Sequence, residues 1–139
     1  MKHRRLRIEE SDEVAVVHFV NCEIINEPTA QIVGQELFDL IESGKYRNLV
    51  LNFASVNLIN SIMLGKLVGL YKRTKARDGE VKLCDLQPVV SETIYYTNLN
   101  NLFDVHPNQA SALEAFAKKG RTVEESKSQG VGGDNGNPV

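Results

Sequence analysis

The pair Asn60-Ser61 is the part of the sequence best suited to chemistry, because it places a hydroxyl where a helix is predicted to begin. An apolar strand over 49–53 and a short apolar step over 56–59 precede the pair, and a run with helical periodicity follows it. Backbone N–H groups at a helix start lack intrahelical partners, and the helix dipole favours negative charge there. Ser61 is therefore either a plain helix cap or a residue that gains and loses a phosphoryl group.

The first turn of this predicted helix carries Ile62 and Met63 and no acidic residue. Four apolar residues further along recur at helical spacing: Leu64, Leu67, Val68 and Tyr71. We expect these four to face the core, which leaves Met63 near the surface. A flexible apolar side chain beside a polar helix start is typical of a docking surface. Gly65 and Gly69 lie four residues apart, which indicates that another backbone approaches closely, either from within the fold, which we favour, or from a partner.

Other catalytic and metal-binding signals are missing from the sequence. It contains no GxSxG, HExxH, GxxxxGK[ST] or GxGxxG motif, and no two of its three histidines have metal-ligand spacing. Asp85 and Asp104 fall at or near predicted strand ends and would be the acid and base of a small enzyme. Because isolated acids at strand ends are usually just solvated, this is the least favoured hypothesis. We expect no catalytic residue, no metal and no cofactor.

The composition is that of an ordinary soluble domain. The chain has 139 residues and a net charge of −2, which gives no bulk electrostatic case for binding nucleic acid or a membrane surface. No run approaches the roughly 20 apolar residues of a membrane span, and no signal peptide follows the basic start, so we expect a cytoplasmic protein. Cys22 and Cys84 lie in separate apolar runs without CxxC spacing, which favours buried thiols in a reducing compartment.

The apolar pattern alternates between strand and helix periods. Strands are predicted over 6–8, 14–20, 49–53, 81–86 and 102–105, and helices after Glu27-Pro28, from Ser61, from Pro88 and after Asn108. Gly44 and Asn98 suit helix ends. This alternation predicts an α/β sheet with helices packed against it, and no internal repeat is visible. We expect one domain over 1–119 and a disordered polar tail over 120–139, where glycines are frequent and apolar periodicity is lost.

The segment LVLNFASVNLINSIMLGKLVGLY resembles the central motif of STAS domains, the family of bacterial anti-sigma factor antagonists. That motif is a hydrophobic strand, a polar turn, an apolar pair, Asp-Ser, and a helix with a Gly-Leu-Gly-like start. Asn60 matches the aspartate, Ser61 the phosphoacceptor serine, and Met63, Leu64 and Gly65 the Gly-Leu-Gly stretch. Asn60 keeps the capping ability of aspartate but lacks its charge. The resemblance continues through VKLCDLQP and LNNLFDVHPNQASALEAF, and covers residues 6 to 119.

The resemblance implies a fold and a function. The fold is a mixed β-sheet of four to five strands with about four helices. The function is that of a non-enzymatic regulator that binds an anti-sigma factor, which is also a serine kinase, and that loses this partner when Ser61 is phosphorylated. A phosphatase of the PP2C type would restore binding. The expected contact residues are Asn60, Ser61, Ile62, Met63 and Lys66. The alternative is a STAS accessory subunit of a transporter or larger signalling assembly, in which Ser61 is only a cap.

Overall fold

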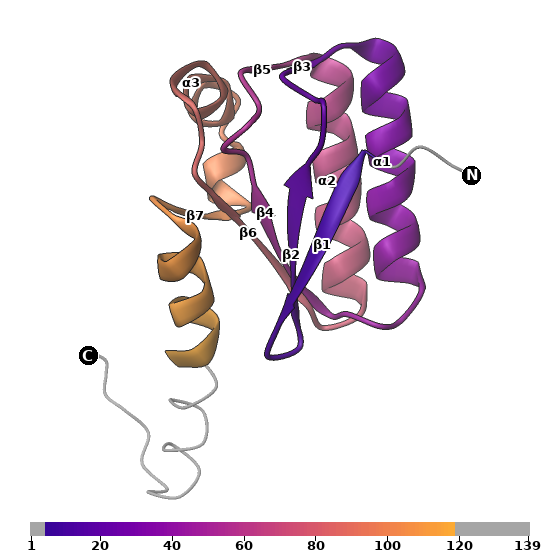
Figure 1. Ribbon diagram of the computed structural model, residues 1–139, viewed down its shortest axis with the longest axis vertical. Coiled ribbons are helices and arrows are strands. Elements are labelled where there is room, and N and C mark those ends of the chain that lie inside the picture. Colours follow the sequence, from indigo (N-terminus) through magenta and orange to yellow (C-terminus); the bar gives the residue numbers. More distant parts are fainter. Residues whose placement is uncertain (1–4, 119–139) are drawn as a thin grey trace, which may run out of the picture.

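A five-stranded mixed sheet forms the centre of the computed structural model, which describes residues 5–118 (Figure 1). The strand order is β1-β2-β4-β6-β7, where β1 is antiparallel to β2 and the other neighbours are parallel. The strand bounds are β1 Leu6–Ser11, β2 Val14–Phe19, β4 Asn48–Asn52, β6 Glu80–Cys84 and β7 Asp104–His106. The carboxyl ends of the parallel strands β2, β4 and β6 therefore meet at one edge of the sheet.

A second, very small parallel sheet lies at that edge. It consists of β3 (Ile24–Ile25) and β5 (Leu58–Ile59), with Ile24 opposite Leu58 and Ile25 opposite Ile59. The carbonyl of Glu23 accepts the N–H groups of Asn57 and Leu58, which extends the contact by one residue. Each of the two strands leads directly into a long helix, so this small sheet sets where both helices begin.

Helices cover both faces of the large sheet. Helices α1 (Glu27–Glu42) and α2 (Ser61–Ala76) run side by side on one face, and the helix over 109–118 lies on the opposite face (Figure 1). Helix α3 (Pro88–Tyr96) and the 3₁₀ turn η1 (Leu99–Asn101) lie near the end that carries the small sheet. None of the described helices is long and apolar enough to cross a membrane.

The two faces of the sheet differ in the size of their cores. The face under α1 and α2 carries the main core, where strand residues such as Val17, Leu51 and Leu83 are fully buried. The opposite face has a small cluster in which Val16 and Val50 pack with Ala112 of the C-terminal helix. Cys22 and Cys84 are both buried free thiols, as the sequence predicted. Most of the apolar burial that stabilises the fold is therefore on the side that carries α2.

The predicted α/β class and mixed sheet are confirmed, and the differences are local. The last strand is Asp104–His106 rather than 102–105, because Phe103 still closes a turn through its N–H bond to the carbonyl of Leu99. Asn98 has the left-handed conformation expected of it, with φ of 62°. Ile32 of α1 is apolar but 43% exposed. The predicted tail over 120–139 lies outside the described residues.

Candidate functional site

The start of α2 holds its first residue in a fixed position. Asn60 is the N-cap in extended conformation, and its Oδ1 accepts the backbone N–H of Met63 at 2.9 Å. The carbonyl of Asn60 accepts the N–H of Leu64 at 3.1 Å, which closes the first turn. The cap function of Asn60 leaves Ser61 as the first helical residue rather than the cap itself, and Ser61 is exposed. The alternative role of Ser61 as a plain cap is thus already filled by Asn60.

The surroundings of Ser61 leave its hydroxyl accessible and carry no negative charge in the first turn. The first turn of α2 contains no acidic residue, whereas α1 has Glu27 at the same place. Ile62 beside it is half-buried and packs against the main core. A hydroxyl at this position faces the positive end of the helix dipole, where a phosphoryl group is electrostatically favoured. The geometry therefore suits an added phosphate better than it suits acid–base catalysis.

Met63 does not lie at the surface, contrary to the sequence prediction. Its side chain is 0% exposed and belongs to the main core. The inward face of α2 consists of residues 63, 67, 70 and 74. The predicted stripe shared only Leu67 with this set, and Leu64, Val68 and Tyr71 are instead half-buried on its flank. An apolar partner therefore cannot dock on Met63 in this fold.

The reason for this error is the breadth of the apolar surface on α2. The helix packs on α1 and on the sheet at once, so residues on its flank are apolar as well as those on its inward face. The inward face also contains a polar residue, Thr74, which is 1% exposed. Its hydroxyl donates to the carbonyls of Leu70 and Tyr71, so it is buried without an unsatisfied donor. Because the inward-facing set includes the polar residue Thr74, its apolar pattern was incomplete in the sequence. The prediction therefore selected apolar residues on the flank of the helix instead.

The two glycines of α2 do not mark a close backbone within the fold, contrary to the favoured prediction. A Cβ at Gly65 would meet open space, and one at Gly69 would meet the ring of Phe38 and the guanidinium of Arg73, both side chains. Gly65 is exposed one turn beyond Ser61, so its surface is free for contact from outside the fold. Gly69 makes room for Phe38 where α1 and α2 pack together.

Lys66 lies along α1 instead of pointing away from the start of α2. Its methylene groups pass over Gly34 so closely that a Cβ there would collide with them, and its Nζ lies 5.7 Å from the ring centroid of Phe38. This packing directs the charge of Lys66 away from Ser61 and toward the middle of α1. Of the five expected contact residues, Asn60, Ser61 and Ile62 are at least partly exposed at the start of α2. Met63 is buried, and the side chain of Lys66 lies along α1.

Two exposed apolar residues next to Ser61 were missed by the sequence reasoning. Ile24 and Leu58 face each other across the small sheet and are 58% and 44% exposed. Leu58 stands three residues before Ser61, and the carbonyl of Glu23 anchors its backbone. Their short strands could not be recognised because two residues give no periodicity. They provide the exposed apolar surface near Ser61 that Met63 was expected to provide.

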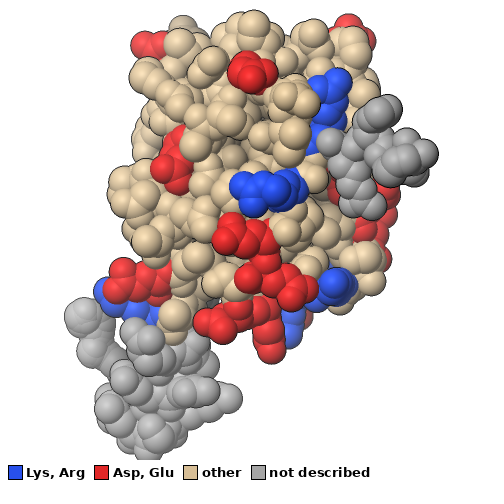
Figure 2. All heavy atoms as spheres, viewed as in Figure 1, with Lys and Arg blue, Asp and Glu red and all other residues tan. Residues whose placement is uncertain are grey.

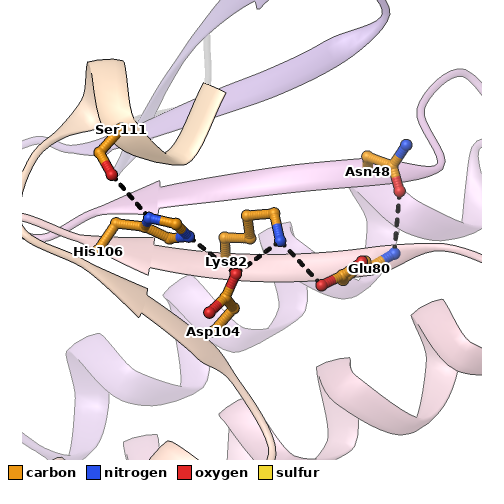
Figure 3. A network of polar contacts seen from close by, with 6 residues as sticks. All are labelled: Asn48, Glu80, Lys82, Asp104, His106 and Ser111. Atoms are coloured by element: carbon orange, nitrogen blue, oxygen red, sulfur yellow. Dashed lines mark hydrogen bonds and ion pairs between the residues drawn. The ribbon is translucent and has the colours of Figure 1, made fainter. Parts of the chain in front are cut away.

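A second polar cluster lies across β6, β7 and the C-terminal helix (Figure 3). Lys82 has a side chain only 4% exposed, and its Nζ forms ion pairs with Glu80 at 2.9 Å and Asp104 at 2.8 Å. The same oxygen of Asp104 contacts Nε2 of His106, whose Nδ1 lies 2.8 Å from the hydroxyl of Ser111. These contacts connect β7 to β6 and to the C-terminal helix, so Asp104 has a structural role.

The charges in this cluster stabilise one another. Burial alone lowers the pKa of Lys82, but hydrogen bonds to Asp104 and Glu80 outweigh it and the net pKa is raised. Burial alone raises the pKa of Asp104, but hydrogen bonds from Lys82 and His106 outweigh this effect and the net pKa is lowered. Both shifts keep the groups charged at neutral pH. Asp85, the other acid considered in the sequence analysis, lies outside this cluster and accepts a hydrogen bond from Asn52 at 3.3 Å.

Comparisons with known proteins agree with the fold. The family model for the STAS domain matches residues 5–112. An anti-sigma F factor antagonist from Paenibacillus polymyxa is 25% identical over 85 residues, which are 61% of this chain and 73% of the relative.

Two solved structures share the fold. The crystal structure of an anti-sigma factor antagonist from Mycobacterium paratuberculosis has a TM-score of 0.70 and 24% identity, covering 79% of this chain and 91% of that one. An anti-sigma-factor antagonist (STAS) domain protein from Planctomyces limnophilus has a TM-score of 0.74 and 20% identity, covering 81% and 97%.

Proposed function

The chain belongs to the STAS domain family, and we propose that it is a cytoplasmic bacterial anti-sigma factor antagonist whose partner binding is switched off by phosphorylation of Ser61. The observation that carries the proposal is the exposed Ser61 hydroxyl at the first position of α2, beside exposed Leu58 and Ile24. The role is regulatory and not enzymatic. The partner is an anti-sigma factor that is also a serine kinase, and a PP2C-type phosphatase reverses the modification.

The physical basis of the switch is a charge introduced into an apolar contact. In the unmodified form the partner covers Ser61 together with Ile24 and Leu58. A phosphoryl group adds about −1.5 to −2 charges. The helix start tolerates this charge in the free protein, where water and the dipole both stabilise it. In the complex the same charge would be buried against apolar groups, which is costly without a partner. The fold therefore stays intact while the complex dissociates.

The first turn of α2 supplies no carboxylate base for the phosphoryl transfer. Asn60 replaces a carboxylate with an amide that is already engaged as the cap, and the first turn of α2 has no acidic residue. In the proposed reaction the proton of the Ser61 hydroxyl passes to a base of the kinase as the Oγ attacks the γ-phosphorus of ATP and ADP leaves. Asn60 positions the helix, and the kinase provides the chemistry.

Binding and mass measurements on purified components test the proposal. The chain is mixed with the anti-sigma factor kinase of the same organism, with and without ATP, and the dissociation constant and intact mass are recorded. We expect a stoichiometric complex, a single phosphoryl addition on Ser61 in the presence of ATP, and release of the partner. Ser61→Asp should weaken binding about tenfold or more, equal to about 1.4 kcal/mol, whereas Ser61→Ala should bind.

Ser43→Asp is the charge control, because it adds the same charge at an exposed site at the opposite end of α1; its folding is checked first, since the Ser43 hydroxyl donates to the carbonyl of Leu40 at that helix end. It should bind as the unaltered chain does. Equal affinity of Ser61→Asp and the unaltered chain would contradict the switch. Binding without any phosphorylation in cells would favour the accessory-subunit role.

A further inference from the structure

The end of the molecule that carries the small sheet contains a short structural repeat. The stretch Ile24-Ile25-Asn26-Glu27 and the stretch Leu58-Ile59-Asn60-Ser61 each form a two-residue strand, an asparagine cap and the first residue of a 16-residue helix. The two strands pair in parallel and in register. Both asparagines are extended N-caps whose side chains accept the N–H three residues on. Four residues are too few for the sequence to reveal this repeat.

The repeat makes Glu27 the structural counterpart of Ser61. Each is the first residue of its helix, and the two helices lie side by side (Figure 1). Paired strands lie about 4.8 Å apart and packed helices about 8–10 Å apart, so the two positions are separated by roughly 5–10 Å. Both residues are exposed. A permanent carboxylate therefore stands next to the proposed phosphoacceptor, at the equivalent end of the neighbouring helix.

The charges around this repeat have one sign. Residues 20–31 and 53–65 contain Glu23 and Glu27 and no lysine or arginine. Lys66 is turned onto α1, and Arg5 at the margin donates from Nη1 to the carbonyl of Asn21 at 2.8 Å. Figure 2 shows a largely uncharged upper end with isolated acidic side chains and a basic patch at its right margin, whereas acidic side chains gather over the β1–β2 hairpin below.

We propose that the partner contacts this repeat with an apolar side chain seated on Ile24 and Leu58, flanked by arginine or lysine side chains that pair with Glu23 and Glu27. The proposal rests on the function given above and adds the chemistry of the partner surface. Exposed apolar residues at the centre of an interface and complementary charges at its rim are the usual division of roles. The rim charges set the association rate. In the complex the partner's cations are already paired with Glu23 and Glu27, so they do not neutralise a phosphate on Ser61, which acts on the apolar centre and hence on dissociation.

A measurement without the partner tests the surface directly. Hexylguanidinium chloride, an apolar chain with an arginine-like head, is titrated into the ¹⁵N-labelled full chain, with hexanol as the uncharged control. The amide shifts should be largest at residues 23–27 and 58–61, and larger with hexylguanidinium than with hexanol. The double variant Glu23→Gln with Glu27→Gln should lose this difference. Shifts spread over the molecule, or an unchanged difference in the double variant, would overturn the proposal.

Association kinetics with the anti-sigma factor kinase provide the second test. The double variant should associate about tenfold more slowly at low salt and approach the rate of the unaltered chain above about 0.15 M salt, where charges are screened. Its dissociation rate should not change, whereas Ser61→Asp should dissociate faster. The double variant Asp12→Asn with Glu114→Gln removes two exposed acids away from the repeat; it is the charge-matched control and should associate normally.

The outcomes separate the two proposals. A kinase that does not bind the unaltered chain contradicts the proposed function, while the hexylguanidinium titration still decides the chemistry of the surface. A kinase that binds with the same rate and salt dependence in the double variant contradicts only the charged rim. An equal loss in the variant Asp12→Asn with Glu114→Gln would also contradict it, because the effect would then follow net charge and not position.

Discussion

Replacement of Met63 by alanine should cost much stability and little binding. The side chain is 0% exposed within the main core. Burial of a methionine side chain is worth about 1.5–3 kcal/mol, and the cavity left by truncation adds to this, so measured losses of this kind are about 2–5 kcal/mol. We expect a value near the middle of this range, about 3 kcal/mol. With a urea dependence near 2 kcal/mol/M, the unfolding midpoint should fall by about 1.5 M.

The neighbouring variant Ile62→Ala is the control for Met63→Ala. Ile62 is half-buried and lies in the same helical turn, so its truncation should cost only about 1 kcal/mol. Unfolding is followed by circular dichroism in urea, and affinity for the kinase is measured where each variant is fully folded. A cost below 1 kcal/mol for Met63→Ala, together with a large loss of affinity, would refute the burial argument and restore the surface position.

Three other variants test the cap, the polar cluster and the helix start, each by urea unfolding. Asn60→Ala should cost about 1–2 kcal/mol, because its Oδ1 caps the N–H of the buried Met63, and a cost below about 0.3 kcal/mol would argue against this. Asp104→Asn should cost about 1–3 kcal/mol, since it leaves the buried Lys82 with one carboxylate fewer, and Lys82→Met should cost less because an apolar side chain needs no partner. The folded-state pKa of Asp104 is lowered. Its stabilising contribution is therefore present above the unfolded pKa of about 3.9 and is lost as the pH falls through the folded pKa. The difference in free energy of unfolding between the unaltered chain and Asp104→Asn should thus disappear in acid. Ser61→Asp should be unchanged or more stable by about 0.3–1 kcal/mol, and a clear loss would show that the helix start does not favour negative charge.

The elements with clear periodicity could be predicted from sequence, and the smallest ones could not. The run Val14–Phe19 is apolar on both faces because helices cover both sides of the central strands, and this pattern identified it as a strand. Strands β3 and β5 have two residues each, and only their pairing reveals them. The exposed pair Ile24 and Leu58 was missed for this reason. A two-residue strand depends on a partner far away in sequence, and no local pattern encodes that partner.

The position of Ser61 was predictable because it depends on local rules. An asparagine followed by a helical run specifies a cap and a first residue wherever the helix packs. The rotation of the helix about its axis is not local, because it depends on which side of α2 fits the sheet and which fits α1. Met63 and Leu64 are both apolar, so the sequence permitted two rotations and favoured the wrong one. Lys82 shows the same limit, since a buried lysine is stable only beside carboxylates that the fold supplies.

The rigid start of α2 bears on how the proposed switch would work. Asn60 caps the helix, Ile59 before it is buried, and Met63 anchors the first turn in the core. The helix start is therefore fixed on both sides of Ser61, and its dipole favours negative charge. We expect that a phosphate on Ser61 would neither unwind the helix nor move it. Its effect must remain at the surface, where Ile24 and Leu58 would contact the partner. Such a switch requires no second conformation of the chain, and its energy comes from the cost of desolvating the phosphate in the complex.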